Sequence, residues 1–351
     1  MRGMSGDIRI DSNPSRQLWD AFLSEFGAGN LQQSYEYGEV AKMINPNTKV
    51  VRLLALDGDT PVGLAQARYN RRFGFGDRLE VGGVYGYGPV VDDSFDKERV
   101  LIELINSMER LAVKDRVCES FIFTLERIHV LERLGYAFEK TFNVYRVRLQ
   151  DRAEELWRLI AHNKRRNIKK ALSHGVDVIC SKKLGDLDAF YEMHALSGKR
   201  VGFIPHPHGY FASFLKVFGA SGRARVFLAF FGGKPVAGVF VVVHGDTAYA
   251  LGAGSRREAW RVRPNDIVHW RAMEWACKEG LSYYHMGFVS EPPPSQGSEG
   301  WGLWRWKREW NGTLQNVHVY HKVLMPRFKK FLLNPYEKVY NITSKLRFYL
   351  I

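Results

Sequence analysis

Residues 233–251 decide the fold, and they read GKPVAGVFVVVHGDTAYAL. The apolar run from Val236 to Val243 predicts a buried β-strand, because it is far shorter than the roughly 18–20 apolar residues that a membrane-spanning helix needs. The turn residues His244-Gly245-Asp246 separate it from a second apolar strand, Thr247 to Leu251. This stretch therefore predicts two neighbouring strands of a sheet.

A helix and a further strand follow this pair. Pro264 suits the first turn of a helix, and the predicted helix runs through Lys278 and ends at Gly280. A strand is predicted at residues 282–286. The order strand, strand, helix, strand predicts a mixed α/β unit.

The same order occurs earlier in the chain, with the proline of Pro61 matching that of Pro235. The predicted elements of this first copy are a strand from about 59 to 69, a strand at 79–87, a helix at about 95–113 and a strand at 120–125. A repeat of this size indicates one unit used twice. We therefore expect an α+β (mixed α/β) protein with domains at 1–150 and 151–325 and a tail at 326–351.

Composition favours a globular protein. The 351 residues are 45% hydrophobic, 13% aromatic and 25% charged, which excludes disorder. Cys118, Cys180 and Cys277 lie far apart, so ordinary buried thiols are expected rather than disulfides or a zinc site. Residues 1–11 contain charges and glycines where a secretory leader needs an apolar run, so a cytoplasmic location is expected.

The positive charge is concentrated in two segments. The formal net charge is +14, from 51 basic and 37 acidic residues. Residues 161–172 hold five basic residues and no acid, and residues 301–351 hold ten basic residues and two acids. Two such patches indicate a phosphate-bearing or anionic partner, although a solvated helix face and a solubilising tail would also produce them.

Between the two copies, a basic helix is predicted at 153–174, stopped by Gly175, and another helix at 186–198. A rigid loop with two prolines is expected at 202–209. The tail at 326–351 mixes basic and aromatic residues at helical spacing. That pattern fits docking on an anionic membrane surface, or equally a helix packed on its own domain.

Several common catalytic motifs are missing from the sequence. There is no phosphate-binding P-loop, no dinucleotide fingerprint opening a helix, no H-E-x-x-H metal motif and no G-x-S-x-G nucleophile turn. Bound nucleotide cofactors, a metal site and serine-hydrolase chemistry are therefore all disfavoured.

The most informative segment is residues 300–312, GWGLWRWKREWNG. If the segment is extended, Trp304, Trp306 and Trp310 face one side while Arg305, Lys307 and Glu309 face the other. Burial of the tryptophans would hold Lys307 rigidly, and a fixed cation can stabilise the oxyanion of a tetrahedral intermediate. The alternative is a surface lysine near tryptophan.

Seven motifs occur in a characteristic order between about residues 30 and 320. They are Leu31 to Lys42, Tyr87 to Asp92, Asn163 to Val176, Gly233 to Gly238, Tyr249 with Gly252 to Ser255, Arg263 to Asn265, and Leu303 to Gly312. Their order and spacing resemble the Fem family (FemABX) of peptidoglycan aminoacyltransferases and their GNAT-like acyltransferase relatives.

The resemblance implies two tandem GNAT-like domains and the transfer of an amino acid from aminoacyl-tRNA to an amine of a peptidoglycan precursor. It implies a catalytic role for Lys307, at the transition state and the tRNA acceptor end. The residues implied to bind substrate are Lys42, at the diphosphate of the precursor, and Tyr87, Asp92, His206, Tyr210, Tyr249 and Arg305.

Two departures from the family pattern concern the precursor. Tyr37 stands where relatives usually have tryptophan, and His206 stands in place of a phosphate-holding arginine. Because histidine is only partly charged near neutral pH, the precursor specificity of the family does not carry over directly.

The chemistry needs no covalent enzyme intermediate, because the aminoacyl ester is already activated. A lysine-like acceptor amine has a pKa near 10.4 and must lose a proton. Asp92 is the candidate base, or it binds the acceptor ammonium without accepting its proton. Tyr249 either hydrogen-bonds the substrate or packs in the core.

The basic helix is expected to meet tRNA phosphates, which predicts binding that weakens strongly with salt. The residues expected to make these contacts are Lys164, Arg165, Arg166, Lys169 and Lys170.

Two rival functions stay open. Acyl-CoA-dependent N-acyl transfer in envelope polysaccharide assembly would use a glycine-rich turn before the central helix, but residues 255–264 have four arginines and no glycine. A non-catalytic binder of an anionic partner is the second.

We expect a monomer without cofactor, metal or DNA. It is expected to act on a precursor that is lipid-linked in relatives, in the cytoplasm or at the inner face of the membrane.

Overall fold

The computed structural model describes residues 7–325 except 28, 73–74, 77, 202 and 290–292. It divides into two compact units, residues 7–142 with 316–325 and residues 143–315. The predicted basic tail at 326–351 lies outside the described residues. The predicted division into independent domains at residues 150 and 325 stays a prediction, since strands β8 (Ala137–Arg148) and β14 (Thr313–Val323) each contribute residues to both units.

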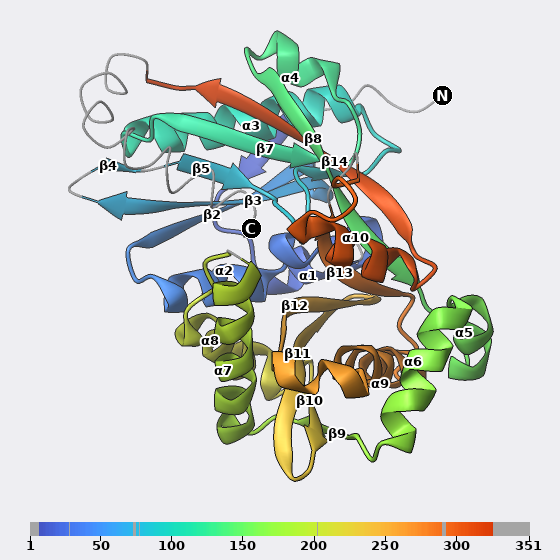
Figure 1. Cartoon of the computed structure of the whole chain (residues 1–351). Helices are drawn as coiled ribbons and strands as arrows, with labels where there is room; N and C mark the ends of the chain where they lie inside the picture. Colours follow the sequence, from blue (N-terminus) through green and yellow to red (C-terminus); the bar gives the residue numbers. More distant parts are fainter. Residues whose placement is uncertain are drawn as a thin grey trace. The chain divides into compact units, whose positions relative to one another are not determined.

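The first unit is built on a sheet ordered β1-β2-β3-β5-β7-β14 (Figure 1). Its strands are β1 (Ile8–Asp11), β2 (Thr48–Asp57), β3 (Thr60–Arg72), β4 (Phe75–Gly76), β5 (Arg78–Val81), β6 (Val90–Val91) and β7 (Glu119–Thr124). Its helices are α1 (Arg16–Phe26), the short η1 (Leu31–Gln33), α2 (Tyr35–Ile44), α3 (Lys97–Lys114) and α4 (His129–Arg133).

Alternation along β2 places helices on both faces of this sheet. Leu53 and Ala55 belong to the core that α3 covers, whereas Leu54 and Leu56 belong to the cluster that contains Trp19 of α1. Successive residues of a strand point to opposite faces, so a continuous apolar run is what a sheet buried on both sides requires.

The second unit has a sheet ordered β8-β13-β12-β11-β10-β9 (Figure 1). Its strands are β9 (Asp177–Ser181), β10 (Ala224–Phe231), β11 (Lys234–His244), β12 (Thr247–Ser255) and β13 (Tyr283–Val289), beside residues 143–148 of β8. Its helices are α5 (Ala153–Leu159), α6 (His162–Ser173), α7 (Leu184–Val201), α8 (His208–Gly219), η2 (Arg257–Val262), α9 (Pro264–Lys278) and α10 (Glu299–Arg308).

The apolar run at 236–243 is strand β11, as predicted. Val239 and Val241 face the core formed with α9, and Phe240 lies against Phe190 of α7 and Phe211 of α8. The hairpin between β10 and β11 turns at Gly232 and Gly233, whose φ angles are 57° and 72°. Such turns need positive φ at both central residues, which glycine adopts without strain.

The parallel pair β12 and β13 determines where the candidate site lies. The two strands pair only at Thr247–Tyr249 and Tyr283–His285, and each then continues without pairing to the other. β13 has an irregular register between His285 and Phe288, where Gly287 has a φ of 73°. Backbone groups at this irregularity are therefore available to side chains.

Several predicted elements need correction. The single basic helix predicted at 153–174 is two helices, α5 and α6, because the backbone is extended at Ile160. The loop predicted at 202–209 gives way to α8 at His208. The strand predicted at 79–87 ends at Val81, since Gly82 and Gly83 have positive φ. Cys118 and Cys277 are buried as expected, but Cys180 is exposed.

Candidate active site

Lys307 lies in the last turn of α10, so the prediction of an extended segment around it was wrong. The alternating tryptophans resembled a strand, but the segment contains no β-branched residue that would favour one. Trp306 lies in the helix and Trp310 lies two residues after its end, and their rings are 5.7 Å apart. Lys307, between them in sequence, is only 8% exposed.

The Lys307 ammonium is held by two backbone carbonyls of β13. Its Nζ donates to Met286 O at 2.7 Å and to Phe288 O at 2.6 Å, on either side of Gly287. A lysine ammonium has three N–H groups. One N–H therefore remains, for which the described residues supply no acceptor.

Burial lowers the pKa of Lys307 to about 8. Among the described residues, no carboxylate lies within ion-pair distance of its Nζ. The group is a positive donor that neutral carbonyls orient. A preorganised cation of this kind can stabilise negative charge that develops on a substrate oxygen.

His285 and Tyr249 lie beside this ammonium. The rings of Tyr249 and His285 are 5.1 Å apart, and His285 directly precedes Met286. Burial, with the charges of Arg146 and Lys307, lowers the pKa of His285 to about 3. His285 is thus neutral at physiological pH and too weakly basic to be the general base. Tyr249 is only 2% exposed, which places it in the core next to the site.

Lys164 was predicted to bind tRNA phosphates, and the structure contradicts this. Its side chain is fully buried, and its Nζ bonds Asp266 Oδ1 at 2.7 Å and lies 3.3 Å from Glu309 Oε2. A buried lysine needs such partners because an unpaired charge in the interior is strongly unfavourable. Nothing in the local sequence pattern identified Asp266 or Glu309 as its partners.

Arg165 is a second correction to the predicted tRNA surface. Its guanidinium donates to the carbonyls of Trp157, Arg158 and Ile160 at 2.6–3.3 Å. Those carbonyls lie at the end of α5, so Arg165 caps that helix. These three bonds, all from Nη1, hold Arg165 against α5, whereas a residue that binds phosphate needs a guanidinium that is free to reach its ligand.

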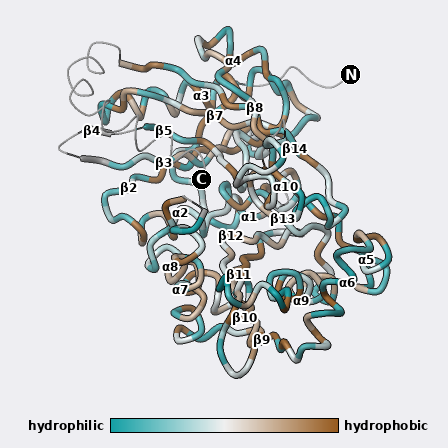
Figure 2. The backbone as a smooth tube through the Cα atoms, viewed as in Figure 1, coloured by the Kyte–Doolittle hydropathy of each residue, from teal (hydrophilic) through white to brown (hydrophobic). Residues whose placement is uncertain are grey.

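Three of the predicted tRNA-binding residues, Arg166, Lys169 and Lys170, do lie exposed on α6. α6 is mostly hydrophilic along its length (Figure 2). Arg305 is also exposed, on α10. The predicted pair His206 and Tyr210 stacks with ring centroids 4.1 Å apart, and Tyr210 is 9% exposed.

In the first unit, two amide side chains hold the glycine-rich loop that carries Tyr87. Asn30 accepts from Tyr87 N at 3.2 Å and donates to Tyr87 O at 2.8 Å, and Gln32 accepts from Tyr85 N at 3.1 Å. A Cβ at Gly83 would meet the Gln32 amide at 2.7 Å, which explains the glycine there. No local pattern predicts a role for Asn30 or Gln32, but the dense glycines nearby are typical of a loop that other groups approach closely.

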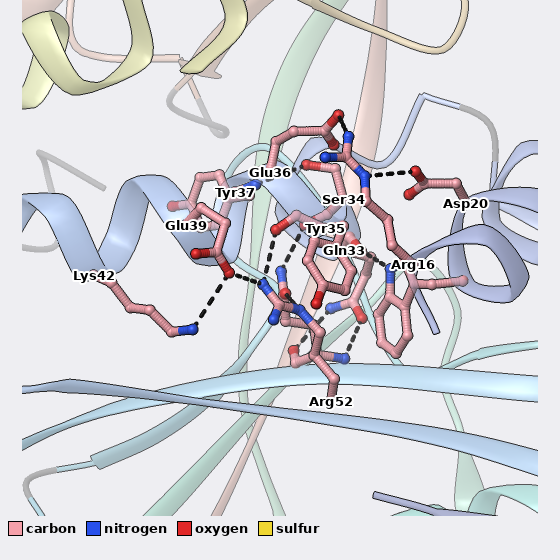
Figure 3. A network of polar contacts seen from close by, with 12 residues as sticks. Arg16, Asp20, Gln33, Ser34, Tyr35, Glu36, Tyr37, Glu39, Lys42 and Arg52 are labelled. Atoms are coloured by element: carbon pink, nitrogen blue, oxygen red, sulfur yellow. Dashed lines mark hydrogen bonds and ion pairs between the residues drawn. The ribbon is translucent and has the colours of Figure 1, made fainter. Parts of the chain in front are cut away.

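Lys42 lies at the exposed end of a polar network in the same unit (Figure 3). Its Nζ is 3.3 Å from Glu39 Oε1, which also accepts from Arg52 at 2.8 Å. Burial opposes ionisation of Glu39, but the hydrogen bond from Arg52 and the charges of Lys42 and Arg52 outweigh it and lower the pKa of Glu39. Arg52 continues the network to Gln66 Oε1 at 2.8 Å. The Lys42 side chain is 45% exposed, as a phosphate contact requires.

Asp92 lies just after β6 and is 9% exposed. Its Oδ1 accepts from Ser94 N at 2.8 Å in a local turn. The predicted residues Asp92, Tyr87 and Lys42 belong to the first unit, and Lys307, Tyr249, His206, Tyr210 and Arg305 belong to the second.

The start of α9 is where a GNAT unit would cradle the phosphates of CoA. Here the first helical residue is Pro264, which has no N–H, and the amides of Arg263 and Asp266 donate to Trp260 O and Arg263 O. The carboxylate of Asp266 itself occupies the first turn. A backbone anion site is therefore poorly formed at this terminus. The described residues also contain no cluster of His, Cys, Asp or Glu able to hold a metal ion.

Comparison with known proteins identifies the fold. Residues 138–308 match a family model described as an acetyltransferase (GNAT) domain. Comparison with curated proteins gives no match. Among solved structures, FemX is similar with a TM-score of 0.78 at 17% identity, covering 92% of this chain and 99% of its own.

Two further structures are similar over most of their length. A tandem GNAT protein from the clavulanic acid biosynthesis pathway has a TM-score of 0.56 at 9% identity, covering 91% of this chain and 99% of its own. The C-terminal domain of a putative lysylphosphatidylglycerol synthetase from Agrobacterium fabrum has a TM-score of 0.54 at 12% identity, covering 88% and 92%. No described helix is long and apolar enough to cross a membrane.

The predicted mixed α/β fold with GNAT-like units is confirmed, and so is the resemblance to the Fem fold. The GNAT match covers the elements that carry Lys307 and its carbonyl partners. The chain has the fold of FemX and of tandem GNAT proteins, and its residues 138–308 match the acetyltransferase (GNAT) domain model.

Proposed function

We propose that this protein transfers an amino acid from aminoacyl-tRNA to an amine of a peptidoglycan or related cell-envelope precursor. The observation that most supports the proposal is the buried Lys307 ammonium, with two N–H groups on carbonyls of β13 and a third without an acceptor among the described residues. Acyl transfer needs a donor of this kind at the carbonyl oxygen of the ester.

The reaction requires no residue to become acylated. A neutral acceptor amine attacks the ester carbonyl and forms the new C–N bond, and the carbonyl oxygen becomes an oxyanion that Lys307 stabilises. Collapse of the tetrahedral intermediate breaks the C–O ester bond. The ribose hydroxyl leaves as its oxygen takes up the proton that the amine has lost.

Aminoacyl-tRNA suits this chain better than acyl-CoA as donor. The first turn of α9 lacks a free backbone cradle for a pyrophosphate, as described above. The exposed cations Arg166, Lys169 and Lys170 on α6, with Arg305 on α10, could instead neutralise backbone phosphates of a polynucleotide.

The acceptor would be recognised by the first unit as well. Tyr87 is fixed by Asn30, and Asp92 presents a carboxylate that could bind the acceptor ammonium or remove its proton. Lys42 would contact a diphosphate, in competition with its present partner Glu39. The proposal includes a lipid-linked precursor and contact of residues 326–351 with an anionic membrane.

The test supplies an amine-bearing cell-wall precursor with labelled aminoacyl-tRNA, with labelled acetyl-CoA, or with unlabelled donors as the blank. Label incorporated only from tRNA supports the proposal. Label incorporated only from acetyl-CoA would establish an acyl-CoA-dependent N-acyltransferase instead. Tight tRNA binding without incorporation would identify a binding protein.

A variant assigns the chemistry to the lysine. Lys307→Ala should lower kcat by about 100- to 1,000-fold, the usual effect of removing one oxyanion donor. Binding of tRNA and precursor should change little. Lys216→Ala, which removes an exposed lysine of the same unit, serves as the control and should keep full activity.

A further inference from the structure

Two sequence motifs that lie far apart in the chain meet at the buried side chain of Lys164. We propose that Lys164, held between Asp266 and Glu309, is a positioning residue that fixes the last turn of α10 and thereby the ammonium of Lys307. The inference rests on the proposed transfer reaction, in which Lys307 stabilises the oxyanion.

The contacts of Lys164 join three helices of the second unit. It projects from α6, bonds Asp266 at the start of α9 at 2.7 Å, and lies 3.3 Å from Glu309, two residues after Lys307. Asn163, its neighbour, donates to the other oxygen of Glu309 at 3.0 Å. The backbone of Glu309 is also held, since Ala161 N donates to Glu309 O at 3.0 Å.

Two tryptophans complete the cage around this ammonium. The Lys164 Nζ lies 4.6 Å from the ring of Trp306 and 4.8 Å from the ring of Trp310. Trp306 also donates its indole N–H to Asp266 Oδ1 at 2.7 Å. Trp306, Glu309 and Trp310 therefore all contact the ammonium of Lys164, and they lie on both sides of Lys307 in the sequence.

The helix that carries Lys307 needs such support. α10 has ten residues, two of them the glycines Gly300 and Gly302, and isolated helices of this length and composition are unstable in water. A buried ion pair is a poor way to gain stability, because desolvation offsets much of its attraction. Its directional contacts do specify one geometry, and that is the property a catalytic ammonium requires.

A purely structural role would act on folding and leave the chemical step intact. The test therefore compares Lys164→Met, which keeps the side-chain length without the charge, with Ile168→Ala. Ile168 lies on the same helix and is fully buried, so its truncation destabilises the unit without removing any polar or cation–π contact of Lys164. Both are assayed well below their melting temperatures, with kcat and KM measured for each substrate.

Lys164→Met should lower kcat by about 10- to 100-fold, the effect of a small misplacement of a catalytic group, while both KM values stay within about twofold. Ile168→Ala should keep kcat at a similar loss of melting temperature. An equal kcat in the two variants, or a loss confined to KM, would overturn the proposal. If Lys164→Met does not fold, Glu309→Gln keeps the volume of the side chain and should show a smaller loss of kcat in the same direction.

A second readout does not depend on turnover. Acylation of Lys307 by a water-soluble succinimidyl ester, followed by peptide mass spectrometry, measures how firmly the ammonium is held. Lys164→Met should speed this modification and Ile168→Ala should not. If the two variants differ in this way but the wild-type protein transfers no amino acid, the proposed function alone is refuted. Equal modification in both variants would refute the positioning role.

Discussion

Lys307 combines a buried ammonium with partners that carry no formal charge. Its two carbonyl acceptors orient it, while burial lowers its pKa to about 8. The proton is therefore still bound at pH 7, but it is lost within the range that an enzyme assay can reach. Because only the charged form can stabilise an oxyanion strongly, activity depends on this proton.

The residue-scale prediction is a loss of activity in mild base. A lowered lysine pKa means that the active, protonated form is present below about pH 8 and disappears above it. The rate of transfer at saturating substrate, divided by the rate of Lys307→Arg at the same pH so that titration of the acceptor amine cancels, should fall about tenfold per pH unit above pH 8. In Lys307→Arg the guanidinium stays charged to above pH 12, so whatever activity remains should not decline before pH 10. A decline at the same pH in both proteins would assign it to another group.

At the scale of elements, α6 has two faces with different roles. Its buried face includes Ile168, which packs in the core, and Lys164, whose contacts reach Asp266 and Glu309. Its exposed face presents Arg166, Lys169 and Lys170. Only this exposed face fits the expectation of contacts with tRNA phosphates.

The element-scale prediction concerns the salt dependence of tRNA binding. Neutralising three phosphate contacts should reduce the slope of log K against log salt by about 2–3. The variant is Arg166→Gln/Lys169→Gln/Lys170→Gln, measured by filter binding between 50 and 300 mM salt. The control, Lys182→Gln/Lys183→Gln/Lys216→Gln, removes three exposed lysines elsewhere in the same unit and should keep the wild-type slope. Identical slopes in the two variants would exclude α6 as the tRNA surface.

At the scale of the whole molecule, each unit uses a strand from the other half of the chain. Residues 143–148 of β8 pair with β13 in the second unit, and residues 318–323 of β14 pair with β7 in the first. Val319 and Tyr320 of β14 are fully buried. Cutting the chain near residue 150 therefore removes part of the core of the first unit.

The whole-molecule prediction follows from this exchange. The fragment 1–150 should fail to unfold cooperatively and should aggregate, because β7 is left with an unpaired edge. A fusion of residues 1–142 to 316–325 through a short linker should restore a cooperative thermal transition, since Thr141 and His318 are hydrogen-bonded at 2.8 Å. Thermal unfolding followed by circular dichroism distinguishes the two, and a stable 1–150 fragment would contradict the prediction.

The elements with strong local patterns could be predicted from the sequence. Strand β11, helix α9 with its initial proline, and the repeat of one α/β unit all follow from apolar periodicity and turn residues, which are properties of neighbouring residues. The importance of Lys307 came from its tryptophan-rich segment and from the family resemblance. The helical form of that segment could not be predicted, because the alternation of Trp304, Arg305, Trp306 and Lys307 fits a strand equally well.

Only the tertiary structure decided which charges are buried and what they contact. Lys164 and Lys169 belong to one basic run, yet one is fully buried and the other exposed. The partners of Lys164 lie 102 and 145 residues away, and those of Lys307 lie on strand β13. Local sequence encodes the face on which a residue lies. It does not encode which distant group will meet that face, because that depends on how all the elements pack.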